Sequence, residues 1–180
     1  ALDGAVFTND DDDSRESTAD DMNLLPAVPA VNDAYYFGSD NQFRSILLDI
    51  TTVGDGVWTI VWEYYNGSAW ASLDDYTNYN YIANFRPANT GKRLMGFNIP
   101  PDWSATTVNG TSAYWIRARV SVYTSIVTQP KAGQMWLGHA GLSVSNDLYG
   151  GLIQITGTPG KGQVRRIVSN TTSTITISRR

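Results

Sequence analysis

Acidic side chains are the residues of this chain whose types and positions come closest to a catalytic arrangement. Glu63 could pair with Asp74 or Asp75, and two carboxylates that flank a sugar can act as acid and nucleophile. Glu63, however, falls on the polar face of a predicted strand, while Arg117 and Arg119 share one face of a later strand. We therefore expect Glu63 to be solvated or paired with an arginine.

The residues that could do covalent or phosphate chemistry do not form a recognised motif. His139 is the single histidine, cysteine is absent, and no serine lies in a nucleophile elbow. The sequence GTPGKGQ (157–163) contains glycines and a lysine, but it lacks the GxxxxGKS or GxxxxGKT spacing of a phosphate-binding loop. We expect His139 to be a packing or linker residue, and the protein to be neither an enzyme nor the carrier of a cofactor.

Acidic residues also suggest a calcium site as an alternative. Asp10, Asp11, Asp12 and Asp13 with Glu16 could supply the oxygen ligands that Ca²⁺ prefers, and so could the carboxylates of residues 74 and 75. Neither set has the spacing of a DxDxDG calcium loop. An exposed acidic run is the simpler interpretation, so we predict no resident metal.

Aromatic residues in predicted loops are the candidate glycan contacts, because exposed aromatic faces can stack on sugar rings. These residues are Tyr76, Tyr79, Tyr81 and Trp103. The strand residues Trp58, Trp62, Trp70 and Trp115 are expected instead to fill the core or a subunit interface, where large aromatic side chains contribute most.

Short strands joined by turns must position all of these side chains. Alternation of apolar and polar residues places Trp58, Ile60, Trp62 and Tyr64 on one face of a strand. Asn66-Gly67 predicts a tight hairpin turn, because both residues tolerate positive φ, and Asn109-Gly110 predicts a second turn. Further strands are expected at 33–37, 45–51, 70–73, 93–99 and 113–124, and such spacing favours a β-sandwich.

Three segments follow from this pattern. Residues 1–32 are predicted to be an extended acidic N-terminal arm that packs Leu24, Leu25 and Val28 onto the body. Residues 33–137 form the jelly-roll-like β-sandwich body. Residues 138–180 form a small C-terminal β unit with strands near 152–156, 163–168 and 174–178. We therefore predict an all-β protein. No apolar run approaches the roughly 20 residues of a membrane span, so we expect no membrane partner.

Charge is distributed unevenly along the chain. Residues 1–40 contain ten acids against Arg15 alone, whereas residues 131–180 contain six bases against Asp147. Such ends are electrostatic complements that could set register between copies, with Asp10, Asp11, Asp12 and Asp13 on one side and Arg165 and Arg166 on the other. The net charge of −4 argues against a dedicated nucleic-acid binder.

Several motifs carry a family resemblance. LLPAVPAVNDAYYFG (24–38), WEYYNGSAW (62–70), IPPDW (99–103), VNG (108–110) and YWIRARV (114–120) together resemble a module of structural proteins of tailed bacteriophages and related viruses, in head, tail or baseplate components. ITGTPGKGQVRRIVSNTTSTITI (155–177) resembles a second phage element, in which a GxGQ turn joins two strands. The resemblance implies a role in particle architecture or attachment and supplies no catalytic residue.

We therefore expect a non-enzymatic virion structural protein that forms a homo-oligomer and contacts other virion proteins. A capsid decoration or head-fibre protein is favoured over a tail or baseplate component. Two alternatives remain open: a carbohydrate-binding or adhesin module that recognises host-surface glycans, and a subunit of an extracellular filament in which one copy adds a strand to the next.

Overall fold

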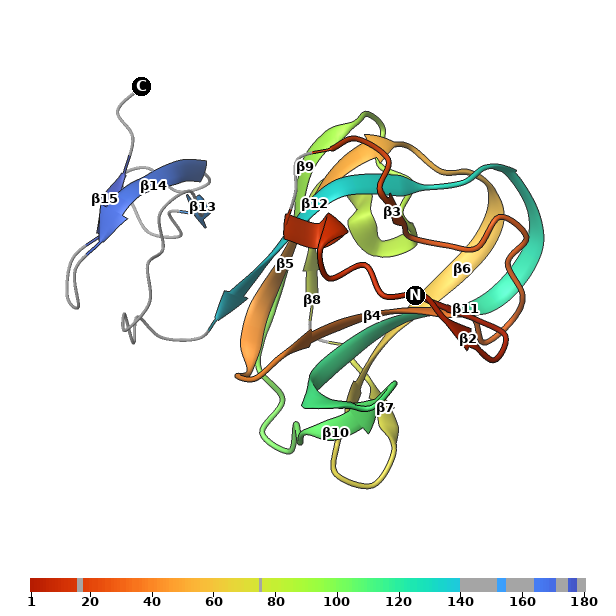
Figure 1. Cartoon of the computed structure of the whole chain (residues 1–180), viewed down its shortest axis with the longest axis horizontal. Helices are drawn as coiled ribbons and strands as arrows, with labels where there is room; N and C mark the ends of the chain where they lie inside the picture. The colour runs from red at the N-terminus through yellow and green to blue at the C-terminus, as the bar shows by residue number, and fades with distance from the viewer. Residues whose placement is uncertain (16–17, 75, 140–151, 155–163, 171–174, 178–180) are drawn as a thin grey trace. The chain divides into compact units, whose positions relative to one another are not determined.

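The chain consists of two compact units, which are described separately. In the computed structural model, residues 1–15, 18–74, 76–139, 152–154, 164–170 and 175–177 are described. The first unit spans Ala1–Ala140 and the second spans Gly141–Arg180 (Figure 1). For residues 76–81 and for most of the second unit, the description covers the backbone alone.

Two antiparallel sheets form the first unit. The first sheet has the order β2-β1-β4-β11-β6-β7, and β10 pairs with β11. The second has the order β3-β12-β5-β9-β8. The strands of the first sheet are β1 (Leu2–Asp3), β2 (Val6–Phe7), β4 (Ala34–Ser39), β6 (Asp55–Tyr65), β7 (Trp70–Ser72), β10 (Thr106–Val108) and β11 (Thr111–Thr128). Those of the second are β3 (Met22–Asn23), β5 (Phe43–Thr52), β8 (Tyr76–Asn78), β9 (Gly91–Phe97) and β12 (Lys131–His139).

The strand order confirms the predicted jelly-roll-like sandwich. The chain passes from β3 in the second sheet to β4 in the first, back to β5, and then to β6 and β7. The last two strands are inserted between earlier ones, since β11 lies between β4 and β6 while β12 lies between β3 and β5. This insertion of late strands between early ones is the double Greek-key arrangement of a jelly roll.

Alternation along the strands builds the core between the sheets. On β6, Trp58, Ile60 and Trp62 are buried, whereas Thr59 between them is exposed. The neighbouring strand β11 contributes Ile116, Ala118 and Val120 from the same sheet, and β5 contributes Ile46, Leu48 and Ile50 from the opposite sheet; all six are fully buried. The predicted inner faces of β5, β6 and β11 are confirmed, because a half-buried strand turns every second side chain inward.

The two Asn-Gly pairs form different turns. Asn109 and Gly110 both have positive φ, 46° and 80°, and join Val108 to Thr111 in a two-residue hairpin. At Asn66-Gly67 only the glycine has positive φ, and the loop is four residues long, since Tyr65 pairs with Trp70. The hairpin predicted at Asn66-Gly67 is therefore present, and β7 returns from Trp70 as expected. The Asn66 side chain accepts hydrogen bonds from the backbone N–H groups of residues 68 and 69.

A short 3₁₀ helix, η2 (Tyr79–Asn84), closes one edge of the sandwich. The indole N–H of Trp58 donates to the carbonyl of Asn84 at 2.9 Å, and that of Trp62 donates to the carbonyl of Ala83 at 3.0 Å. The prediction that Tyr76, Tyr79 and Tyr81 lie in a loop was therefore wrong. These residues belong to η2 and to the strand β8, which pairs with β9. The carbonyls of η2 let two buried tryptophans keep hydrogen-bond partners in an apolar core.

The first 32 residues join both sheets. β1 pairs with β4 at Ala34, and β3 pairs with β12. Leu24 and Leu25 are buried as predicted, but Val28 is 75% exposed and does not pack on the body. A 3₁₀ turn, η1 (Asp13–Arg15), lies between β2 and β3.

Within the described residues of the second unit there are three antiparallel strands, at the positions where strands were predicted. They are β13 (Leu152–Gln154), β14 (Val164–Asn170) and β15 (Ile175–Ile177), in the order β13-β14-β15. Arg165 and Arg166 lie on β14 opposite Ile153 and Leu152. Among the described residues, no helix is long and apolar enough to span a membrane.

Candidate functional site

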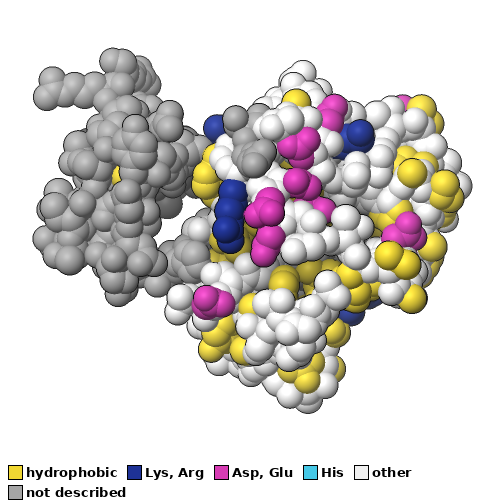
Figure 2. Space-filling view, viewed as in Figure 1, with side chains coloured by type: hydrophobic (Ala, Val, Ile, Leu, Met, Phe, Trp, Pro, Cys, Tyr) yellow, Lys and Arg dark blue, Asp and Glu magenta, His cyan; other side chains and the backbone are white. Residues whose placement is uncertain are grey.

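A pocket of about 410 Å³ lies on the first unit where the segment after β2, the end of β4 and the β10–β11 hairpin meet. We call it the Asp10 pocket. Its walls carry the carboxylates of Asp10, Asp11 and Asp40 and the aromatic rings of Tyr36 and Trp115. Acidic side chains gather on the face of the first unit that carries η1 (Figure 2). These residues are far apart in the sequence, and the sheet order brings them together.

Local hydrogen bonds hold Asp10 in position. The N–H of Ser14 donates to the carbonyl of Asp10 at 2.8 Å, and the hydroxyl of Ser14 donates to the carbonyl of Asp11 at 2.8 Å. The amide of Gln134 on β12 donates to the carbonyl of Arg15 at 3.0 Å, which attaches this turn to the second sheet. Asp10 to Asp13 are therefore part of a folded turn and not a free acidic tail.

The Asp10 carboxylate is mostly buried yet incompletely satisfied. Its side chain is 8% exposed, and its Oδ2 atom has no hydrogen-bond partner among the described residues. The amino nitrogen of Ala1 lies 3.9 Å from Oδ2, beyond hydrogen-bond distance, and donates to the Thr8 carbonyl instead. Burial raises the pKa of the neighbouring Tyr35 phenol, and the negative charge of Asp10 together with the hydrogen bond between the Tyr35 hydroxyl and the Asp10 side chain raises it further. The Asp10 side chain therefore has one partner in Tyr35, and the unmet hydrogen-bonding capacity lies at Oδ2. A buried acceptor without a donor is uncommon in a folded protein and marks a place where a ligand could bind.

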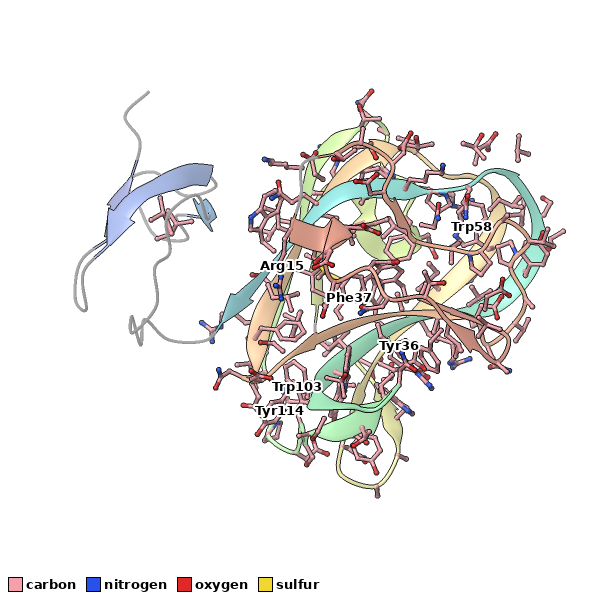
Figure 3. All side chains as sticks on the ribbon, viewed as in Figure 1. Arg15, Tyr36, Phe37, Trp58, Trp103 and Tyr114 are labelled. Atoms are coloured by element: carbon pink, nitrogen blue, oxygen red, sulfur yellow. The ribbon has the colours of Figure 1, made fainter. Side chains whose placement is uncertain are left out.

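The aromatic wall of the pocket is held rigidly. The Trp115 ring lies on the backbone of Gly38, where an added Cβ would come within 2.3 Å of it. Its indole N–H donates to the Thr106 carbonyl at 3.1 Å. Tyr36 meets Trp115 edge-on, with ring centroids 6.3 Å apart and an interplanar angle of 86°. Tyr36 and the buried Phe37 follow each other on β4 (Figure 3).

Outside the pocket, the aromatic surface continues across the outer face of the first sheet. Tyr36 packs edge-on against Trp70 at 5.7 Å, and the guanidinium of Arg117 lies over the Trp70 ring at 4.3 Å. Arg117 and Arg119 both bind Glu63, as predicted for this carboxylate. Burial would raise the pKa of Glu63, but hydrogen bonds from Arg119 and Arg117 outweigh it and lower the pKa. Glu63 therefore serves as the anion of an ion-paired cluster.

The carboxylate pair considered for glycoside chemistry is not assembled by the described residues. Both oxygens of Glu63 accept hydrogen bonds from arginines. Asp74 accepts a hydrogen bond from the hydroxyl of Ser72, and Asp75 lies outside the described residues. For the calcium alternative, no three His, Asp or Glu side chains within the described part of the chain come together as metal ligands, while Glu16 falls outside that part.

The predicted glycan contacts have different outcomes. Trp103 is 3% exposed, and its indole N–H donates to the Trp115 carbonyl, so its prediction as a surface contact was wrong. It packs edge-on against Phe43 and Tyr114 inside one end of the sandwich (Figure 3). The backbones of Tyr76, Tyr79 and Tyr81 belong to β8 and η2, and their side chains lie outside the description. The side chains of Arg165, Arg166 and His139 lie outside it as well.

The sequence predictions missed the Asp10 pocket because no single segment signals it. Gly38 could have offered a clue, since a glycine next to aromatic residues in a strand often marks a close approach of another group. Comparisons with protein-family models, with curated proteins and with solved structures gave no match.

Proposed function

We propose that the protein is a non-enzymatic structural component of a virus particle, where it assembles with copies of itself and with other virion proteins. The motifs that resemble phage structural proteins support this function. The jelly-roll order of the strands also agrees with it, because this architecture recurs in viral capsid and lectin domains. A capsid decoration or head-fibre role is our preferred location, with a tail component as the second.

The opposite charges of the two compact units carry the assembly part of this proposal. Residues 1–140 contain sixteen acids and eight bases, whereas residues 141–180 contain five bases and one acid. Acids of the first unit are concentrated at the turn that holds Asp10, while Arg165 and Arg166 of the second unit lie on β14. Complementary charge on different parts of a subunit sets orientation and register when copies associate.

The outer face of the first sheet suits burial between subunits. Tyr36, Trp70 and Trp115 are partly exposed there, around the Glu63–Arg117–Arg119 cluster. Aromatic residues and arginine are enriched at protein interfaces because they bury large areas and still satisfy polar groups. A structural subunit would use such a surface for adhesion instead of catalysis.

Immunogold electron microscopy tests where the protein resides. An antibody raised against the first unit should label virus particles purified from a lysate of the source culture. Labelling of cellular filaments alone would favour the filament alternative and overturn the proposal, as would labelling of neither particles nor filaments.

A further inference from the structure

We propose that the Asp10 pocket binds a neutral saccharide unit. This inference is independent of assembly, and it places sugar recognition at a site other than the aromatic residues 76, 79, 81 and 103. It depends on the charge of the pocket, the hydrogen-bonding capacity of its walls, the fixed aromatic rings and the incompletely satisfied carboxylate of Asp10.

Charge determines which classes of ligand can enter. Asp10, Asp11 and Asp40 contribute three carboxylates to the lining, against two positive groups among the described lining residues, the guanidinium of Arg15 and the amino group of Ala1. An anionic ligand such as a phosphate or a sialic acid would be repelled. Neutral and cationic ligands are therefore the classes that the charge of the pocket allows.

Hydrogen-bonding capacity separates a neutral polyol from a cation. Asn109 and Thr111 line the pocket with an amide and a hydroxyl, groups that donate as well as accept. An organic ammonium group can only donate hydrogen bonds. The donors in the wall of the pocket would therefore find no acceptor on such a ligand. Each hydroxyl of a sugar both donates and accepts, and it can therefore use carboxylates, amides and hydroxyls together.

The aromatic wall matches the apolar face of a sugar ring. Trp115 is fixed by contact with Gly38 and by its hydrogen bond to Thr106, and Tyr36 supports it edge-on. Because these rings are already ordered, binding would not need to order them, which favours affinity. A few fixed polar groups beside aromatic side chains are typical of small-ligand pockets.

Asp10 supplies the observation that points most directly to a bound donor. Its side chain is more than nine-tenths buried, and its Oδ2 atom lacks a hydrogen-bond partner among the described residues. Oδ2 itself is covered, so a sugar hydroxyl would reach it after a small rotation of the carboxylate and would satisfy it without adding a charge to the site. The volume of about 410 Å³ falls in the range of small-molecule pockets, so we expect one or two sugar rings to bind.

The test uses the full-length chain on an array of immobilised neutral glycans with terminal glucose, galactose, mannose, N-acetylglucosamine or N-acetylgalactosamine. Titration calorimetry with the best neutral glycan then measures affinity. Asp40→Ala and Asn109→Gly should each weaken binding about tenfold, since each removes a hydrogen-bonding group. Glycine at 109 tolerates the φ of 46° found there.

Control variants outside the pocket test whether a loss of glycan affinity is specific to the pocket. Asp49→Ala removes a carboxylate from the second sheet, and Gly96→Ala changes a strand glycine whose added Cβ would make only an ordinary van der Waals contact, at 3.9 Å. Both should leave affinity within about twofold of the parent protein. Gly38→Ala should weaken binding by displacing Trp115, and thermal unfolding of each variant verifies that it is folded.

Three results would overturn the inference. One is the absence of binding to any of the neutral glycans at about millimolar concentration. Another is binding that Asp40→Ala, Asn109→Gly and Gly38→Ala leave unchanged in folded protein. The third is preferential binding of spermine or a lysine-rich peptide, which would assign the pocket to cations. Arg165→Glu/Arg166→Glu should keep glycan binding, so a failure of assembly is distinguishable from a failure of this site.

Discussion

Arg119 binds both carboxylate oxygens of Glu63 from the neighbouring strand. Its Nη2 donates to Oε1 at 2.7 Å, and its Nε donates to Oε2 at 2.9 Å. Arg117, directly opposite Glu63 in the β6–β11 register, donates to Oε2 at 2.6 Å. The cluster lies on the outer face of the sheet, yet Glu63 is only 9% exposed. The single carboxylate of Glu63 is thus the counter-ion of two arginines, at a position that is mostly buried.

Glu63→Gln should lower the free energy of unfolding by about 2–4 kcal/mol. The change leaves two partly buried guanidinium groups without a counter-charge, and removal of one partner from a buried ion pair is costly. Urea denaturation measures the loss. Asp49→Asn is the matched control, because the Asp49–Lys92 pair is 3.9 Å long and partly exposed and should contribute less than about 1 kcal/mol. Equal effects of the two variants would contradict this role of Glu63.

Acid should weaken the contribution of Glu63. Its pKa in the folded protein is lower than the usual value of 4.5 for a glutamate side chain, so the unfolded chain binds this proton more tightly than the folded chain. The stabilisation is therefore fully present above the unfolded pKa and is lost as the pH falls through the folded pKa. The difference in unfolding free energy between the parent protein and Glu63→Gln should shrink as the pH is lowered below 4.5. A difference that stays constant down to acid unfolding would contradict the expectation.

Gly38→Ala should destabilise the fold by about 1–3 kcal/mol, the usual cost of overpacking. A Cβ at this position would come within 2.3 Å of the Trp115 ring and would push the indole away from the Thr106 carbonyl. Gly96→Ala is the control, since the nearest atom to its added Cβ is 3.9 Å away. Thermal unfolding measures stability, and the NMR resonance of the Trp115 indole N–H reports the displacement. An unshifted indole resonance would show that the ring does not depend on Gly38.

Asn84→Ala should cost about 1–3 kcal/mol, because it leaves a backbone donor of the core without its partner. The Asn84 side-chain oxygen accepts from the N–H of Ile60 at 2.8 Å. Asn89→Ala provides the comparison, since Asn89 is exposed and its backbone carbonyl binds Arg93. That change should stay within about 0.5 kcal/mol. Hydrogen exchange at Ile60 should accelerate in Asn84→Ala alone, and unchanged exchange would argue against this hydrogen bond.

Strand patterns made much of the fold predictable. Period-two alternation identifies the inner faces of β5, β6 and β11, because burial on one face of a strand leaves a direct record in the sequence. It also places Glu63 opposite Arg117 and Arg119, since polar side chains on one outer face become cross-strand neighbours.

The geometry of the turns and the packing of side chains at the end of the sandwich were less predictable. The two Asn-Gly pairs have the same residues but form loops of different length, because the register of the flanking strands decides how many residues remain between them. Trp103 follows two prolines in a turn, where exposure would be expected, yet contacts with Phe43 and Tyr114 bury it. Only the folded end of the sandwich brings these rings together.

The Asp10 pocket depends on long-range order and is the least predictable feature. It combines the turn after β2, the end of β4 and the β10–β11 hairpin, which meet because β11 is inserted beside β4. Charge alone indicated that Asp10 to Asp13 mattered, but an acidic run on its own does not distinguish an exposed tail from a folded turn.

Sedimentation velocity of the full chain, at low and high salt, tests the proposed self-assembly most directly. We predict an oligomer at about 0.05 M salt that dissociates at about 1 M, where the Debye length falls to roughly 3 Å. Arg165→Glu/Arg166→Glu should be smaller than the parent protein already at low salt, while Lys92→Glu serves as a charge-reversal control on the first unit. A monomer at every salt concentration, or an oligomer that neither salt nor Arg165→Glu/Arg166→Glu changes, would contradict assembly through complementary charge.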